Sequence, residues 1–192
     1  MSIEISNRKL DSYSFEDYSH FEPNFKCEII WGKVVMMSPA PSFIHQDTIG
    51  KLFIELTNKI PPKCKVILSP IDVLLDFNED FRQCKNIVQP DIVVLCNQDK
   101  ITNKGIIGSP DLVIEIVSPS SLHNDTISKY NLYEKFGVQE YWIVFPEMRT
   151  IVINTLENDS YISETYNYND IIIEAKSKVF DALKINMEVV FE

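Results

Sequence analysis

The sequence predicts an α/β or α+β protein in which one mixed central sheet is flanked by helices. Two continuous apolar runs, at residues 92–96 and 112–117, have the pattern of strands that are buried on both faces. Between residues 42 and 60, apolar side chains recur at the spacing of one helical face. Because these helical and strand patterns fit within 192 residues, we expect a single domain spanning residues 1–192.

Turn and capping signals place the other elements. A short helix is predicted at residues 14–18, with Ser14 as its N-cap and Asp17 in the capping-box position, inside an N-terminal extension of about 25 residues. A hairpin at residues 27–37 follows and turns near Trp31. The later elements are a helix over 42–60 that ends before Pro61-Pro62, a strand over 66–77, the two apolar strands, a helix over 124–136 with Gly137 at its C-cap, and strands over 140–145, 150–156 and 161–166.

The charge balance restricts how the protein can bind nucleic acid. The chain has 18 basic and 28 acidic residues, which gives a formal net charge of -10. This balance argues against a general basic surface for nucleic acid, but it leaves room for a local basic groove or an acidic site that works through bound cations. The hydrophobic fraction of 45% excludes wholesale disorder.

Hydropathy and cysteine usage indicate a cytoplasmic protein. No apolar run approaches the roughly 18 to 20 residues of a membrane span, and the first nine residues are polar. The four cysteines contain no Cys-x-x-Cys pair, and we expect them to be reduced, buried thiols: Cys27, Cys64, Cys84 and Cys96.

Two carboxylates stand in strongly apolar surroundings. Glu115 interrupts an apolar strand, where an isolated charge costs several kcal/mol unless it is paired or bound to a metal. Asp91 opens the other apolar strand. If the two strands are neighbours, the carboxylates lie close together and either one pKa rises or a divalent cation is recruited. Such carboxylate-rich sites suit Mg²⁺ or Mn²⁺.

A lysine on the next predicted helix completes the cluster. Lys129 lies on the apolar stripe that continues through Leu132, Tyr133 and Phe136, so it faces the sheet. Asp125 lies four positions earlier on the same stripe and is placed to pair with it.

Simpler interpretations stay open. Asp91 could be a turn residue, and Glu115 with Lys129 could form a buried ion pair without catalytic use. Ser118 begins a Ser-Pro-Ser-Ser segment that could hold a phosphate, although helix capping is its ordinary role. His45, at the start of a predicted helix, is a further candidate for the site.

Several motifs carry a family resemblance, over about residues 15–153. They are Glu28-Ile29-Ile30-x-Gly32, Met37-Ser38-Pro39-x-Pro41, His45-Gln46, Gln89-Pro90-Asp91, residues 109–120, Asp125-x-x-x-Lys129-x-x-x-Tyr133, and residues 137–144. With these motifs the sequence resembles the Uma-two family of restriction-endonuclease-like proteins, in the PD-(D/E)XK nuclease superfamily. The resemblance implies a restriction-endonuclease-like core that carries a metal site on adjacent central strands.

The resemblance also assigns roles. Asp91 resembles the motif aspartate and Glu115 the acidic member of (D/E)XK, and both would hold Mg²⁺, with Mn²⁺ as a substitute. Val117 stands where the pattern has its lysine, and Lys129 resembles a displaced lysine from the next helix. Glu28 resembles an additional metal-binding acid. The implied reaction is metal-assisted hydrolysis of phosphodiester bonds in nucleic acid, with DNA as the expected substrate.

An alternative from a different class is a catalytically inactive binding module that keeps the nuclease fold. The acidic balance favours this alternative, because Lys100, Lys104 and Lys129 are the only basic residues that we can place near a scissile phosphate. No membrane partner is expected. A symmetric homodimer would suit double-strand cleavage, and the sequence leaves the oligomeric state open.

Overall fold

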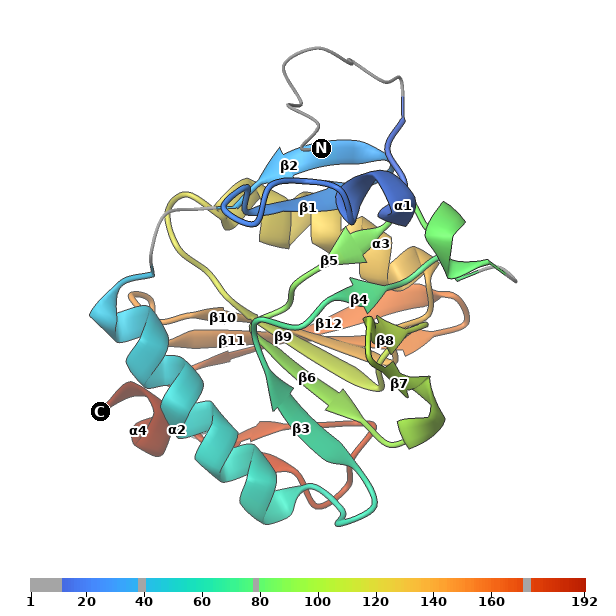
Figure 1. Ribbon diagram of the computed structural model, residues 1–192. Coiled ribbons are helices and arrows are strands. Elements are labelled where there is room, and N and C mark those ends of the chain that lie inside the picture. The colour runs from blue at the N-terminus through green and yellow to red at the C-terminus, as the bar shows by residue number, and fades with distance from the viewer. Residues whose placement is uncertain (1–11, 38–40, 78–79, 171–173) are drawn as a thin grey trace.

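A computed structural model describes residues 12–37, 41–77, 80–170 and 174–192 of the chain. Residues 1–11 of the expected N-terminal extension, and Ser38 and Pro39 of the second motif, lie outside the described residues. The strands form two six-stranded sheets, here called sheet A and sheet B, and Figure 1 shows the N-terminal hairpin of sheet A above sheet B. The predicted mixed α+β architecture is confirmed, but the chain forms a second large sheet in addition to the expected central one.

Sheet B is the central sheet and contains both apolar runs. Its order is β12-β11-β10-β9-β6-β3, in which β9 and β10 are parallel and the other neighbours are antiparallel. All residues of β6 and β9 are buried, as the continuous apolar runs predict. The strands are β3 (Lys65–Leu68), β6 (Ile92–Leu95), β9 (Leu112–Ile116), β10 (Glu140–Phe145), β11 (Thr150–Glu157) and β12 (Ser160–Asn167).

Sheet A begins with the predicted hairpin. Trp31 and Gly32 both have positive φ, at 53° and 72°, which is the geometry of a two-residue hairpin turn. The sheet order is β2-β1-β5-β4-β8-β7, and β4 and β8 are parallel. The strands are β1 (Cys27–Ile30), β2 (Lys33–Met36), β4 (Val73–Leu74), β5 (Ile87–Val88), β7 (Ile101–Thr102) and β8 (Gly105–Ile107).

Helices cover both faces of sheet B. One core cluster joins α2 (Phe43–Lys59), α4 (Met187–Phe191) and the small hairpin β13 (Glu174–Lys176) and β14 (Lys184–Asn186) to one face. A second cluster joins α3 (Lys129–Lys135) and sheet A to the other face (Figure 1). No helix in the described residues is long and apolar enough to cross a membrane.

Most of the predicted elements are confirmed, including the helix α1 (Phe15–Tyr18), where the Ser14 backbone N–H donates to Asp17 at 2.8 Å. The predicted strand over 66–77 is wrong. Its first part is β3 in sheet B and its second part is β4 in sheet A. The chain changes sheets at Ser69-Pro70, where proline interrupts strand pairing.

The prediction of four reduced cysteines is wrong for two of them. Cys64 and Cys96 form a disulfide, whereas Cys27 and Cys84 are free and buried. The antiparallel register of β3 and β6 explains the pairing. It places Lys65 opposite Leu95, so the residues just outside that pair, Cys64 and Cys96, also face each other.

Glu140 at the start of β10 anchors the C-terminal segment. Its carboxylate is fully buried and accepts hydrogen bonds from Trp142 Nε1 at 2.8 Å, Ser177 Oγ at 2.8 Å and the Lys178 backbone N–H at 2.6 Å. Trp142 and Ser177 are themselves buried, so their donor groups depend on this one acceptor. Glu140 therefore holds the segment that follows β13 against sheet B.

We predict that Glu140→Ala lowers the free energy of unfolding by about 3 kcal/mol, because the buried donors of Trp142 and Ser177 lose their acceptor. Urea unfolding at neutral pH measures this change. Glu157→Ala, on the exposed end of β11, is the matched control and is expected to stay within about 0.5 kcal/mol of the wild type. Equal stabilities for the two variants would contradict the anchoring role.

Candidate active site

Asp91 and Glu115 lie beside each other on adjacent antiparallel strands. Ile92 of β6 is opposite Ile114 of β9, so the next residue outward on each strand brings the two carboxylates together. The Ile116 backbone N–H donates to Asp91 Oδ2 at 2.8 Å, and the Asp91 N–H lies 3.4 Å from Glu115 Oε2. The sequence-based prediction that the two strands are neighbours is confirmed.

Lys129 meets carboxylates from three different elements. Its Nζ lies 2.9 Å from Glu115 Oε1 on β9, 2.9 Å from Glu28 Oε1 on β1, and 3.8 Å from Asp125 Oδ1. The lysine is only 5% exposed. We call Glu28, Asp91, Glu115, Asp125 and Lys129 the carboxylate–lysine cluster.

The helix before α3 presents two members of the cluster on one side. Asp125 lies in a π-helical segment, η4 (Asn124–Ser128), which continues directly into α3 at Lys129. π-Helical turns inside α-helices occur frequently at functional sites. The Tyr141 hydroxyl donates to the Asp125 backbone carbonyl at 2.8 Å and thereby ties the segment to β10.

Burial and charge perturb the pKa values of the cluster. Burial opposes the charge of Lys129, but the carboxylates of Glu115, Glu28 and Asp125 outweigh it and hold the lysine pKa well above its ordinary value. Burial raises the pKa of Glu115 well above its usual range, and the neighbouring acids add to this effect while Lys129 opposes it. Burial likewise raises the pKa of Asp125 to about 6. Strongly perturbed groups that converge in this way are typical of functional sites.

Tyr133, one helical turn after Lys129, supports the same carboxylate. Its hydroxyl donates to Glu115 Oε1 at 3.0 Å. Burial and the charge of Glu115 raise the pKa of Tyr133 well above its ordinary value, so the hydroxyl remains a donor at physiological pH. Glu115 Oε1 thus accepts hydrogen bonds from both residues, and its position is closely defined.

His45 borders the cluster from the first turn of α2. Its Nε2 lies 3.4 Å from Asp91 Oδ2. Burial disfavours the charged ring, but the hydrogen bond and charge of Asp91, together with a hydrogen bond to the backbone of Ile116, raise the pKa of His45. Ser42 caps the helix by accepting the His45 backbone N–H at 3.3 Å, and the ring of His45 lies beside Asp91.

Glu28 connects the cluster to sheet A. Besides Lys129, its Oε1 accepts the backbone N–H of Gln89 at 2.8 Å. The side chain of Gln89 donates to Asp72 Oδ1 at 2.8 Å and to the Tyr18 hydroxyl at 3.1 Å. Gln89 was not among the site residues expected from the sequence, and its position directly before Pro90-Asp91 was the available signal. The metal-ligand role of Glu28 stays a prediction.

Two other sequence candidates lie outside the cluster. The Ser118 backbone N–H donates to Ser121 Oγ at 3.0 Å, within a turn that precedes the helix, which is the capping geometry of its ordinary role. Lys100 Nζ donates to the Ser109 carbonyl at 2.7 Å, at the end of β9 opposite to Glu115. The expectation that Lys100 stands near a scissile phosphate is therefore wrong.

The donor set is compatible with one hard divalent cation. The cluster contains four carboxylates against one lysine, and His45 adds one positive charge only when it is protonated, so negative charge is in excess. Within the described residues no group of three or more acidic, histidine or cysteine side chains is arranged to hold a metal ion. Asp91 and Glu115 remain as a pair of oxygen ligands. Mg²⁺ is commonly held by one or two carboxylates, with water and substrate phosphate as its other ligands.

We predict that Lys129→Met lowers the free energy of unfolding by about 3 to 5 kcal/mol at pH 8, because the carboxylates lose their buried counter-charge. The loss should be smaller at pH 5. Acids whose pKa is raised in the folded state destabilise it increasingly as the pH rises above their ordinary value of about 4.

Denaturant unfolding at the two pH values, with chelator present, measures both effects. The double variant Lys129→Met with Glu115→Gln should recover part of the loss, because one uncompensated acid is removed. A single variant as stable as the wild type at pH 8 would contradict the proposed balance of charge.

Comparisons with known proteins identify the fold and the family. The chain is similar to a crystal structure described as a putative nuclease belonging to DUF820 from Anabaena variabilis ATCC 29413, with a TM-score of 0.71 and 18% sequence identity over 93% of this chain and 97% of that chain. No curated protein matches the sequence. The family model described as "Uma2: Putative restriction endonuclease" matches residues 14–186. Since that match spans nearly the whole chain, the protein belongs to the Uma2 family.

Proposed function

We propose that the protein is a metal-dependent endonuclease that hydrolyses phosphodiester bonds of nucleic acid, with DNA as its substrate. The observation that carries the proposal is the pairing of Asp91 and Glu115 on adjacent strands, with Lys129 in contact with Glu115 at 2.9 Å. Membership of a family whose model is described as "Putative restriction endonuclease" supports a nuclease function. Paired carboxylates next to a buried lysine favour hydrolysis by an activated water.

In this proposal each side chain has a defined task. Asp91 and Glu115 hold Mg²⁺, which lowers the pKa of water and neutralises phosphate charge when it is bound. Lys129 orients the attacking water and stabilises charge on the phosphoryl oxygens. Glu28, Asp125 and Tyr133 hold Lys129 and Glu115 in place, since each of them contacts one of these two residues.

We predict that Glu115→Gln reduces cleavage to background and leaves the fold intact. Glutamine preserves the size of the side chain and can still accept from Tyr133, but it is a poor ligand for Mg²⁺. The assay compares plasmid, linear duplex and single-stranded DNA in the presence of Mg²⁺ or Mn²⁺. Glu164→Gln, in a surface ion pair with Lys178, is the matched control and should cleave like the wild type. Undiminished cleavage by Glu115→Gln would refute this assignment.

We predict that Asp91→Asn weakens binding of Mn²⁺ at least tenfold, because the site loses one of its two anionic ligands. Isothermal titration calorimetry with MnCl₂ measures the affinity without requiring any turnover. Asp47→Asn, on the exposed side of α2, is the control and should bind Mn²⁺ as the wild type does. An unchanged affinity in Asp91→Asn would place the metal elsewhere.

A catalytically inactive binding module is the second candidate. The observation in its favour is that the Lys129 ammonium is already held by Glu28 and Glu115, at 2.9 Å each. The same cleavage assay separates the two functions. Absence of cleavage by the wild type on every nucleic acid, combined with intact metal binding, would favour the binding module.

A further inference from the structure

An aromatic pair, half-exposed Trp31 and partly buried Phe136, lies at the far end of the two elements that carry Glu28 and Lys129. Trp31 follows β1 and Phe136 follows α3, and their ring centroids are 5.7 Å apart. Along α3, Phe136 lies about 10 Å from Lys129 by the rise of an α-helix. Trp31 is 48% exposed and has a φ of 53°, a conformation that favours asparagine or glycine. Neither core packing nor turn formation accounts for a tryptophan at this position.

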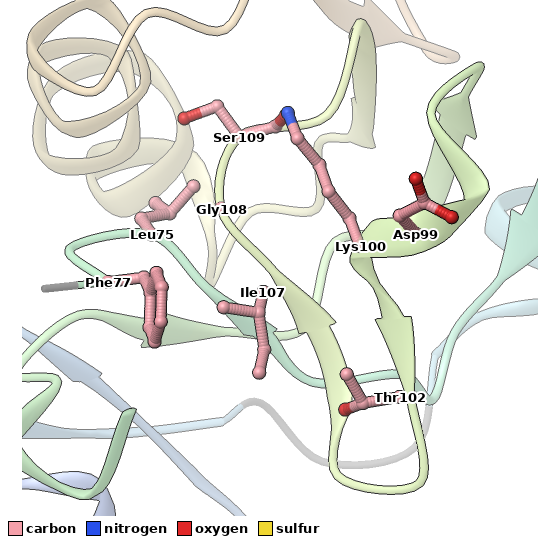
Figure 2. A pocket seen from close by; sticks show the side chains of 8 residues that line it. All are labelled: Leu75, Phe77, Asp99, Lys100, Thr102, Ile107, Gly108 and Ser109. Atoms are coloured by element: carbon pink, nitrogen blue, oxygen red, sulfur yellow. The ribbon is translucent and has the colours of Figure 1, made fainter. Parts of the chain in front are cut away.

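A pocket adjoins this pair. Its volume is about 490 Å³, and Ser109 lies on its lining. The Ser109 hydroxyl donates to the backbone carbonyl of Phe136, so the lining of the pocket meets the main chain just after α3. Figure 2 shows Phe77, Leu75 and Ile107 as the apolar side chains of the pocket, opposite Lys100 and Asp99. Phe77 is 49% exposed, so a second aromatic face is open to solvent nearby.

Four lysines surround these aromatic residues. Lys33 follows the Trp31-Gly32 turn, and the Lys85 carbonyl accepts the Gly32 N–H at 2.9 Å. Lys135 directly precedes Phe136, and Lys100 lines the pocket. No ion pair within the described part of the chain includes any of the four. Acidic residues lie among them, because Asp99 lines the same pocket and Asp76 accepts the Lys85 backbone N–H at 3.0 Å. The four lysines are therefore distinguished by lying outside every described ion pair, not by a net positive charge of the surface.

We propose that this aromatic–lysine surface, made of Trp31, Phe77, Phe136 and the four lysines, binds single-stranded nucleic acid. Exposed aromatic faces stack with unpaired bases, and neighbouring cations attract the phosphate backbone. In a duplex the base faces are stacked on one another, so the rings cannot reach them. The inference deepens the proposed nuclease function, because it names an unpaired strand as the form of nucleic acid that the enzyme holds.

Fluorescence anisotropy with short labelled oligonucleotides tests the proposal. The full chain is titrated, with EDTA present to prevent cleavage, against single-stranded DNA, single-stranded RNA of the same sequence, and the corresponding duplex DNA. We expect both single strands to bind at least tenfold more tightly than the duplex. The DNA and RNA arms identify which sugar the surface prefers. Duplex binding as tight as single-strand binding would overturn the proposal.

A charge-reversal variant locates the binding surface. Lys33→Glu, Lys85→Glu and Lys135→Glu together should weaken single-strand binding at least tenfold and reduce the slope of log affinity against log salt by about 2. The matched control carries Lys63→Glu, Lys65→Glu and Lys184→Glu, which gives the same net charge on another part of the surface. If the two triple variants lost the same single-strand affinity, the net charge of the protein would explain the loss, and the proposal would be overturned.

A single substitution tests the stacking contribution. Trp31→Asn keeps a residue that tolerates positive φ at the turn, so the hairpin should fold as in the wild type. We expect at least a fivefold loss of single-strand affinity. Tyr168→Asn, at an aromatic residue beside Arg149, is the control and should retain wild-type affinity. Unchanged binding by a folded Trp31→Asn variant would contradict stacking at this surface.

The outcomes separate this inference from the proposed function, because binding is measured without metal. Cleavage that depends on Glu115 while no single-strand binding maps to the aromatic–lysine surface would overturn the inference and leave the nuclease function standing. Binding that depends on Trp31 and the lysines, without cleavage of any nucleic acid, would support the inference and overturn the nuclease function.

Discussion

The structure depends most on one interaction, the contact of the Lys129 ammonium with buried carboxylates from separate layers. Glu28 comes from sheet A, Glu115 from sheet B, and Asp125 from the π-helical segment before α3. Burial makes each isolated charge costly, so the layers must pack in a way that brings the lysine into contact with the acids. The apolar packing of α3 between the sheets brings these groups together, and their charges then fix the position of the helix relative to both.

Much of the central sheet could be predicted from the sequence because its signals are local. The apolar runs around Val93 and Val113 predict strands buried on both faces, and helical spacing predicts α2. The candidate site could be predicted from the sequence for the same reason. An acid inside an apolar strand, such as Glu115, is conspicuous, and helical geometry alone places Lys129 on the face toward the sheet.

The rest of the fold and of the site depends on contacts between segments that are far apart in the sequence, and local sequence patterns do not specify these contacts. The chain leaves sheet B after Leu68 and enters sheet A at Val73. Pro70 marks a break between the two segments, but no local pattern shows that they belong to different sheets. The disulfide follows from the register of β3 with β6, which hydropathy does not specify. The contact of Glu28 with Lys129 spans 101 positions in the chain, and only the resemblance to a nuclease family had suggested that Glu28 belongs to the site.

Electrostatics explains why the carboxylate–lysine cluster and the lysines of the aromatic–lysine surface lie on separate parts of the protein. A lysine added beside Asp91 and Glu115 would compete with a divalent cation for the same carboxylates, as Lys129 already does for one oxygen of Glu115. Cations that attract a phosphate backbone are better placed outside this cluster. In this protein the four lysines lie instead at the opposite ends of β1, β9 and α3, beside exposed aromatic rings. An acidic protein can in this way keep a carboxylate-rich centre for a metal and hold a polyanion through a separate surface.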